Sequence, residues 1–131
     1  MTRYLLNTNV AIAAALGARS VLDRMARLPV GDVAISAVSY GELLAGAAGA
    51  TTDRRLNENL AVISDNIDIL SFDRAAAETY GRVMKRLDPK RRRILDRMIA
   101  AHALSVGATL VTTSADDFED LPGLKVEVWQ I

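Results

Sequence analysis

Short apolar runs alternate with helix-like segments along most of this chain. The runs predict β-strands over residues 4–6, 33–35, 68–70, 109–111 and 125–128. The segments between them carry apolar residues at helical spacing, over about residues 9–16, 18–28, 38–49, 53–66, 74–87 and 91–107. Thr52 or Asp53 and Asp73 are predicted to cap the starts of two of these helices, Gly107 to end the longest, and Pro89 to interrupt the helical pattern near residue 88. Strands that alternate with helices favour βαβ units, in which parallel strands form a sheet covered on both faces. The predicted fold class is therefore α/β, with a mostly parallel central sheet.

The composition agrees with such a fold. The chain has 131 residues, of which 50% are hydrophobic and only 5% aromatic. This length predicts a single domain over residues 1–131, and the Ala- and Leu-rich make-up favours helices on a small sheet over a β-sandwich. The sequence shows neither a signal-peptide pattern nor an apolar stretch long enough to span a membrane, so we expect a cytoplasmic protein with no membrane partner.

Two residue types exclude whole classes of functional site. The chain has no cysteine, which rules out disulfides, zinc–thiolate sites, iron–sulfur clusters and thiol nucleophiles. Its one histidine, His102, rules out a histidine-rich metal site. Because His102 lies among alanines, a packed helix residue is the favoured interpretation over a ligand or general base.

The charges balance overall but are unevenly placed. The 16 basic and 16 acidic residues give a formal net charge of zero, which excludes a globally basic nucleic-acid-binding protein. Bases nevertheless gather over residues 85–97, on both sides of Pro89, and acids gather over residues 116–120. The basic run could hold a phosphate backbone. The alternative is a solvated helix face.

Polar residues follow three of the predicted strands. In an open α/β sheet, ligands bind outside the carboxyl ends of the strands, so these positions are candidates for a functional site. They are Asn7, Thr8 and Asn9 after the first strand, Ser36 and Glu42 after the second, and Thr112, Thr113, Ser114, Asp116 and Asp117 after the fourth.

Glu42 and Asp96 lie on helix faces that are otherwise small or apolar. Burying such a charge is costly unless it is paired or binds a metal. Other interpretations stay open: Glu42 as a surface residue, and Asp96 as a helix-start acid stabilised by the dipole or paired with Arg92 or Arg93. For the acids after the fourth strand, the alternative is a capping or turn role.

Carboxylates that converge from separate segments repel each other, and a divalent cation removes that repulsion. An all-oxygen ligand set suits Mg²⁺ or Mn²⁺. Such a site can activate water and stabilise the leaving oxygen in phosphodiester hydrolysis. The pattern makes this chemistry plausible without specifying it.

Read together, these residues resemble the PIN-domain ribonucleases, and most closely the VapC toxins of bacterial toxin–antitoxin pairs. The family opens with an Asp-Thr-Asn motif, matched here by Asn7-Thr8-Asn9. Its Ser…Glu-Leu…Gly helix is matched by residues 36–46, and its Asp followed by Ile-Ala-Ala-His-Ala-Leu by residues 96–104. Its last strands, with an acid-Phe loop, Pro-Gly-Leu and a final Trp, are matched by residues 109–129. The resemblance covers essentially the whole chain.

The resemblance implies a PIN-like three-layer sandwich with about five strands and a four-acid Mg²⁺ site, with Mn²⁺ as a substitute, that cuts RNA endonucleolytically. Glu42 and Asp96 carry over directly as ligands. Asp117 aligns best with the fourth acid, and Asp116 is its neighbour. The remaining expected contributions are polar support from Thr8, Asn9, Thr112 and Ser114, and RNA contacts from Arg91, Arg92, Arg93 and Arg97.

One position departs from the family pattern. The first acid is Asn7 here, and an amide keeps an oxygen ligand but loses the charge and cannot act as a base. We expect weaker Mg²⁺ binding and a barrier raised by about 3–5 kcal/mol. Two explanations stay open: an engineered change that silences an otherwise intact toxin so that it can be expressed, or a natural variant that is a non-catalytic PIN-fold module and only binds RNA or antitoxin. A phosphatase with an aspartyl nucleophile is disfavoured. That chemistry needs an Asp at the end of the first strand, and usually another two residues later, but Asn7 and Asn9 are both amides.

The resemblance also implies partners. We expect a homodimer that forms a hetero-oligomer with a VapB-type antitoxin, whose tail covers the acidic cleft. Operator DNA would be bound only through the antitoxin. The expected substrate is a structured RNA, either a transfer RNA or a ribosomal RNA.

Overall fold

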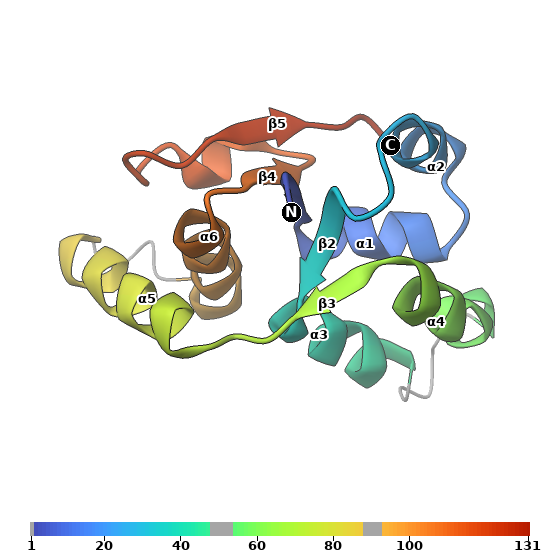
Figure 1. Cartoon of the computed structure of the whole chain (residues 1–131), viewed down its shortest axis with the longest axis horizontal. Helices are drawn as coiled ribbons and strands as arrows, with labels where there is room; N and C mark the ends of the chain where they lie inside the picture. The colour runs from blue at the N-terminus through green and yellow to red at the C-terminus, as the bar shows by residue number, and fades with distance from the viewer. Residues whose placement is uncertain (1, 48–53, 88–92) are drawn as a thin grey trace.

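The structure is a computed structural model, and it describes residues 2–47, 54–87 and 93–131. Helices and strands alternate along the chain (Figure 1). Their order is β1 (Tyr4–Leu6), α1 (Thr8–Ala15), α2 (Arg19–Ala26), β2 (Val33–Ser36), α3 (Ala37–Ala47), α4 (Arg54–Asn66), β3 (Asp68–Leu70), α5 (Arg74–Arg86), α6 (Ile94–Val106), β4 (Thr109–Thr112), the 3₁₀ helix η2 (Ala115–Phe118) and β5 (Val126–Val128).

The five strands form one sheet in the order β3-β2-β1-β4-β5. Every neighbouring pair is parallel, and Leu6 of β1 lies opposite Ile35 of β2 and Val111 of β4. This confirms the predicted α/β class and parallel sheet. The chain adds strands on one side of β1 first and then on the other, so the order reverses between β1 and β4. Such a switch point is where α/β sheets bind ligands.

Side chains alternate between the two faces of the sheet, as the two-residue period of a strand requires. Leu6, Ile35 and Val111 pack into a core with residues of α1 and α4. Leu5 and Leu110 point the other way, into a second core with residues of α6. Figure 1 shows α1, α2 and α4 on one side of the sheet and α5 and α6 on the other. The structure is therefore a three-layer sandwich.

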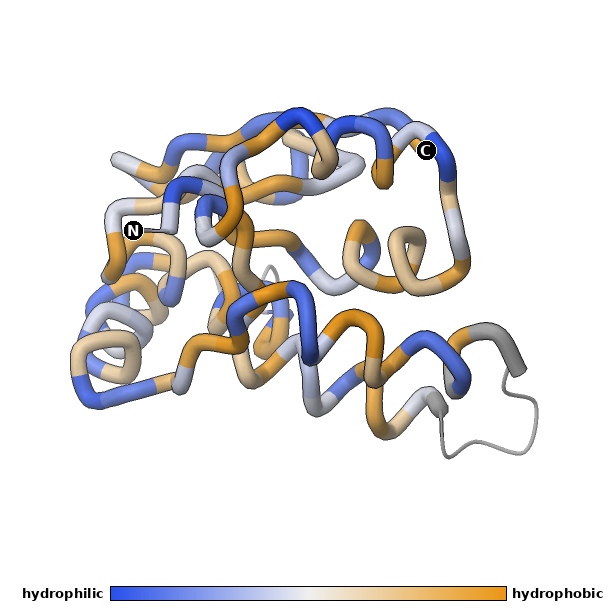
Figure 2. The backbone as a smooth tube through the Cα atoms, turned by 45° about the vertical axis from the view of Figure 1, so that its right-hand side comes forward, coloured by the Kyte–Doolittle hydropathy of each residue, from blue (hydrophilic) through white to orange (hydrophobic). Residues whose placement is uncertain are grey.

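Figure 2 shows hydrophobic and hydrophilic residues interleaved along the backbone of the helices. The predicted helix boundaries are close to those observed. Asp73 caps α5 by accepting from the Ala76 N–H at 3.0 Å, and Gly107 ends α6 in the left-handed conformation with φ 70°, as the sequence predicts. The proposed caps at residues 52 and 53 and the break at Pro89 lie outside the described residues.

The loops and helices that follow β1, β2 and β4 place polar side chains at the carboxyl edge of the sheet. Asn7 follows β1 directly, Ser36 ends β2 and leads into α3, and Thr112 ends β4. The Asn7 N–H donates to the Val111 carbonyl at 2.8 Å, which joins the ends of β1 and β4. Among the described residues, no helix is long and apolar enough to cross a membrane.

Candidate functional site

Asn7 lies where the central strand ends and α1 begins. It occupies the N-cap position, but its side chain makes no capping hydrogen bond. Only 6% of the residue is exposed, and its Oδ1 is buried without a hydrogen-bond partner. Buried polar atoms in folded proteins are almost always satisfied. An amide oxygen left without a partner at this position is therefore available to a ligand.

Thr8 joins Asn7 to the acid on α3. Its hydroxyl carries one hydrogen, and Glu42 Oε1 is the nearer acceptor, at 2.6 Å. Ser39 Oγ lies 3.1 Å from the same hydroxyl, on the α3 turn before Glu42. Glu42 is half-buried, so it is held by α1 and not free in solvent as a surface glutamate would be. This contact brings the first and second motifs together.

Asn9 and Thr112 organise the edge between α1 and the segment after β4. The Asn9 Nδ2 donates to Thr113 Oγ1 at 2.7 Å. Thr112 is 1% exposed, and its Oγ1 accepts from the Ser114 N–H at 3.3 Å. Ser114 precedes η2 without capping it through its side chain. These polar residues therefore shape the loop in addition to any contact with a ligand.

Asp96 lies in the first turn of α6 and is half-buried. Its negative charge suits the N-terminal end of a helix. The sequence left open that Asp96 pairs with Arg93. In the structure Arg93 pairs with Asp117 instead, with Arg93 Nη1 3.5 Å from Asp117 Oδ1. Arg91 and Arg92 lie outside the described residues.

Asp116 and Asp117 both lie in η2, where they are differently exposed. Asp116 is exposed, whereas the Asp117 side chain is 40% exposed and held by Arg93. Of the two acids, Asp117 is thus the more fixed.

The donor set at this edge consists of oxygen atoms, which fits a hard divalent cation. Within residues 2–47, 54–87 and 93–131, no group of three or more His, Cys, Asp or Glu side chains is close enough to hold a metal ion. Position 7 supplies a neutral amide oxygen to this set. The unpartnered Asn7 Oδ1 beside the Thr8–Glu42 pair is the local feature that fits a cation.

The expectation that Arg97 contacts RNA is wrong. Arg97 is 2% exposed, its Nη1 lies 3.0 Å from Asp120 Oδ1, and its guanidinium lies 5.8 Å from the centroid of the Phe118 ring. A basic run along the chain suggests a solvated face. The pattern cannot show that an acid 23 residues later supplies a buried partner.

His102 is a packed helix residue, as the sequence predicts. It is 1% exposed and its ring stands edge-on to Phe72, with centroids 5.5 Å apart. Its Nδ1 lies 2.8 Å from Ser36 Oγ, and burial lowers the pKa of the imidazole despite the nearby Asp73 carboxylate. Sequence reasoning did not find the link to Ser36, because nothing in the spacing of the two residues indicates it.

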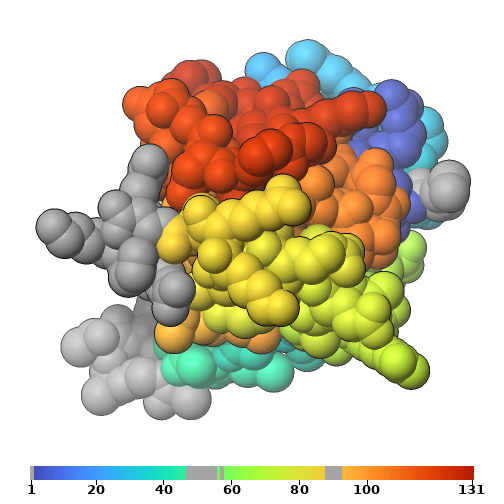
Figure 3. All heavy atoms as spheres, turned by 90° about the vertical axis from the view of Figure 1, so that its left-hand side faces the viewer, coloured from blue at the N-terminus to red at the C-terminus, as the bar shows by residue number. Residues whose placement is uncertain are grey.

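Three surface pockets lie away from this edge. The largest, about 540 Å³, is lined by α5, α6 and residues 120–122. Figure 3 shows α5 lying beside the C-terminal segment on that face. Another, about 280 Å³ and largely apolar, lies between α1, α2 and α4. None of the three includes Asn7, Glu42 or Asp96.

Comparison with known proteins shows the family of the chain. The family model for the PIN domain matches residues 4–124. The tRNA(fMet)-specific endonuclease VapC of Shigella flexneri is 34% identical over 134 residues, covering 98% of this chain and 99% of that protein. Ribonuclease VapC2 of Haemophilus influenzae strain Rd is 31% identical, with coverage of 98% and 99%.

Solved structures show the same fold. The DNA-bound VapBC of Salmonella typhimurium superposes with a TM-score of 0.87 and 28% identity, covering 99% of this chain and 100% of that chain. VapBC2 of Rickettsia felis, bound to a DNA fragment from its promoter, gives a TM-score of 0.84 and 27% identity, with coverage of 98% and 100%. The chain therefore belongs to the PIN domain family, and within that family it belongs with the VapC ribonucleases.

Proposed function

We propose that this chain is the toxin of a VapBC-type toxin–antitoxin pair and that its site supports metal-dependent endonucleolytic cleavage of RNA. The observation that carries the proposal is the buried, unpartnered Oδ1 of Asn7 beside the Thr8–Glu42 hydrogen bond at the switch point of the sheet. The relative from Shigella flexneri is named as a tRNA(fMet)-specific endonuclease, which favours a structured RNA, transfer RNA first, as the substrate class.

The residues that would hold Mg²⁺, or Mn²⁺ in its place, are Asn7, Glu42, Asp96 and Asp117, with Asp116 as a neighbouring acid. A divalent ion held by these residues would supply charge neutralisation at the reacting phosphate and activation of the attacking water. Thr8 orients the Glu42 carboxylate through its 2.6 Å hydrogen bond. The Arg93 guanidinium restrains Asp117.

Asn7 sets the activity of the chain as it stands. A neutral amide can bind a cation through its oxygen, but it contributes no negative charge to balance the ion and cannot accept a proton from water. We propose that cleavage is therefore strongly impaired and that an aspartate at this position restores it. The alternative favoured by the same amide is a PIN-fold module that binds RNA or antitoxin without cleaving.

The partners follow from the relatives. The two solved structures of similar chains described above are VapBC complexes, and both are bound to DNA. We propose a VapB-type antitoxin, a homodimer of this chain within the resulting hetero-oligomer, and contact with operator DNA only through the antitoxin. Because the substrate is RNA, we place the protein in the cytoplasm.

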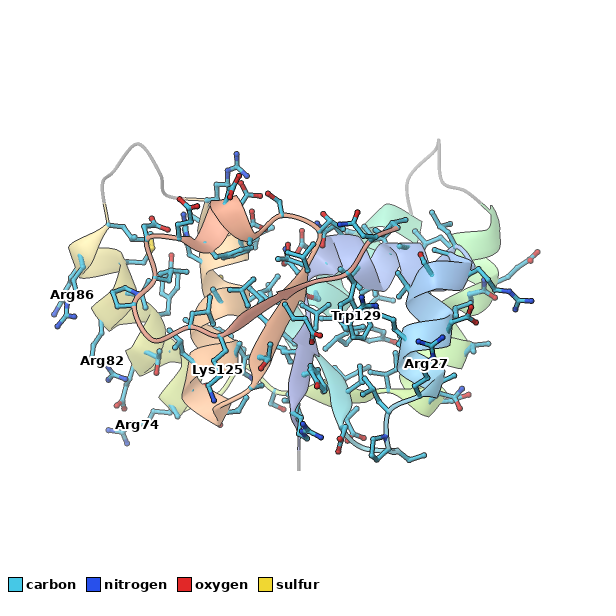
Figure 4. All side chains as sticks on the ribbon, turned by 90° about the horizontal axis from the view of Figure 1, so that it is seen from above. Arg27, Arg74, Arg82, Arg86, Lys125 and Trp129 are labelled. Carbon is cyan, nitrogen blue, oxygen red and sulfur yellow. The ribbon has the colours of Figure 1, made fainter. Side chains whose placement is uncertain are left out.

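Basic side chains near the edge would meet the phosphate backbone. Arg93 is 65% exposed in its side chain and lies beside Asp117. Arg82 and Arg86 project from α5 (Figure 4), but they line the pocket of about 540 Å³ that lies away from this edge, so we do not count them among these side chains. Arg91 and Arg92 stay candidates from the sequence.

The test is cleavage of total cytoplasmic RNA by this chain and by Asn7→Asp, side by side, with Mg²⁺ or Mn²⁺ and with a chelator. We expect discrete fragments from Asn7→Asp only, lost in the chelator and in the double variant Asn7→Asp/Glu42→Gln. Fragment ends would name the RNA. If folded Asn7→Asp, free of antitoxin, cuts nothing, the nuclease proposal fails and the binding module replaces it.

A further inference from the structure

Two buried side chains connect the helices that carry Glu42 and Asp96. Ser36 at the end of β2 is 0% exposed, and His102 in the middle of α6 is 1% exposed. Their polar atoms, Ser36 Oγ and His102 Nδ1, are 2.8 Å apart. The contact therefore crosses from the start of α3 to α6 inside the protein, where water does not compete for it.

Ser36 is also the N-terminal cap of α3. Its Oγ accepts from the Val38 N–H at 3.1 Å, which is the usual bond of a capping serine to the second helical residue. The hydroxyl thus fixes the start of the helix on which Glu42 lies, six residues after Ser36. A group that fixes the Ser36 hydroxyl fixes this cap as well.

His102 supplies the other end of the contact. It lies six residues after Asp96 on the same helix, about 9 Å along the helix axis. Because an α-helix is stiff over this length, the position of His102 determines the position of Asp96. The edge-on packing of the ring on Phe72 restrains the imidazole further.

We propose that the Ser36–His102 hydrogen bond is a positioning contact that holds the capped start of α3 against α6 and so fixes the spacing between Glu42 and Asp96. His102 is neutral in this role and carries its proton on Nε2, and its Nδ1 accepts from the Ser36 hydroxyl. This proposal rests on the proposed function in one respect, that Glu42 and Asp96 share a metal.

The hydrogen-bond inventory supports this assignment. The Ser36 oxygen already accepts from Val38, and its own hydrogen needs an acceptor, which the unprotonated Nδ1 provides. Burial lowers the pKa of His102, which favours the neutral ring. The one electrostatic influence that opposes this shift comes from Asp73.

The protonation state can be measured directly, because His102 is the only histidine in the chain. Nitrogen-15 NMR of histidine-labelled protein reports which ring nitrogen carries the proton. At neutral pH we expect Nδ1 in the range of an unprotonated nitrogen and Nε2 protonated. A protonated Nδ1 in the unsubstituted protein overturns the assignment, whatever the variants show.

The positioning role is tested with two substitutions in the Asn7→Asp background. His102→Phe keeps the ring volume and removes the acceptor, whereas His102→Asn keeps a polar atom near the position of Nδ1. The control is Ser105→Ala, which removes a 2.7 Å hydrogen bond to the His102 carbonyl within α6 and leaves the contact with α3 intact. Mn²⁺ affinity and amide exchange of Val38 are measured for each.

We expect His102→Phe to weaken Mn²⁺ binding about three- to tenfold, the scale of one lost hydrogen bond, and to speed exchange of the Val38 amide. His102→Asn should recover part of both effects, and Ser105→Ala should change neither. Folded His102→Phe with unchanged Val38 exchange and Mn²⁺ affinity would reduce His102 to a packing residue. If no Asn7→Asp protein cleaves RNA or binds Mn²⁺ but Val38 exchange responds as expected, the nuclease proposal fails while the link between the helices stands.

Discussion

Arg97 and Asp120 form a buried ion pair across the chain, with Nη1 and Oδ1 3.0 Å apart and side-chain exposures of 3% and 18%. Arg97 directly follows Asp96, and Asp120 lies just beyond η2, which carries Asp117. The pair therefore ties the first turn of α6 to the segment next to Asp117, the residue that we propose as the fourth acid. It is a structural contact between two parts of the candidate site.

Breaking one side of this pair should destabilise the fold. Arg97→Met removes the guanidinium from beside the largely buried Asp120 carboxylate, and we expect a loss of about 3 kcal/mol in the free energy of unfolding. Urea denaturation followed by circular dichroism measures it. The double variant Arg97→Met/Asp120→Leu should recover much of the loss, because no charge is then left unpaired. Equal losses in the single and double variants would contradict this account.

Removing the Thr8 hydroxyl should affect the site more than the fold. In the Asn7→Asp background, Thr8→Val removes the donor to Glu42 Oε1, a hydrogen bond to a charged group worth about 1.5–3 kcal/mol. We expect cleavage to fall about ten- to a hundredfold, measured as single-turnover rates on a transfer RNA. Thr8→Ser keeps the donor and should retain most of the activity. Full activity of Thr8→Val would remove this contact from the site.

Arg93 should act on RNA through charge alone. Losing one phosphate contact reduces the slope of log affinity against log salt by about 1, with a nearly uniform loss of affinity across RNA sequences. Fluorescence anisotropy with Arg93→Ala at several salt concentrations measures the slope. Arg74→Ala is the matched control. Arg74 is an exposed arginine at the N-terminal end of α5, where it pairs with Glu78 at 2.8 Å. Equal slopes for both variants would exclude a contact by Arg93.

His102 should make stability depend on pH in the acid direction. Burial lowers its pKa in the folded protein below the ordinary value of 6.5, so the unfolded chain takes up the proton first as the pH falls. The contribution of His102 is complete above pH 6.5 and is lost as the pH falls from there towards the folded pKa. The unfolding free energies of this chain and of His102→Asn should differ by a constant amount above that range. The difference should shrink as the pH falls through it. Parallel curves would contradict the neutral, buried assignment.

The fold was largely predictable from the sequence, because the apolar runs are short, regularly spaced and separated by helix-length segments. The caps at Asp73 and Gly107 followed from residue type alone. The family resemblance rested on local motifs, which place Asn7 directly after β1, Glu42 within α3 and Asp96 in the first turn of α6. Strand spacing, helix caps and motifs all depend on residues close together in the chain, so they could be predicted from the sequence.

What the sequence could not show are the contacts between distant segments. Arg97 looked like part of a solvated basic face, and only the fold reveals Asp120 beside it. The Ser36–His102 bond joins residues 66 positions apart, and Thr8 meets Glu42 across 34. No periodicity encodes such pairs, because they depend on how helices pack on the sheet.

The central position of β1 has a consequence for how the protein is made. This strand is the first to be synthesised, yet its partners are β2 and β4, and Tyr4 lies opposite both Val33 and Thr109. The hydrogen bond from the Asn7 N–H to the Val111 carbonyl likewise cannot form until Val111 has been synthesised. A chain still emerging from the ribosome therefore cannot complete this edge of the sheet until nearly all of it has been translated. The sheet edge that carries Asn7 and Thr112 is therefore among the last parts of the fold to form during synthesis.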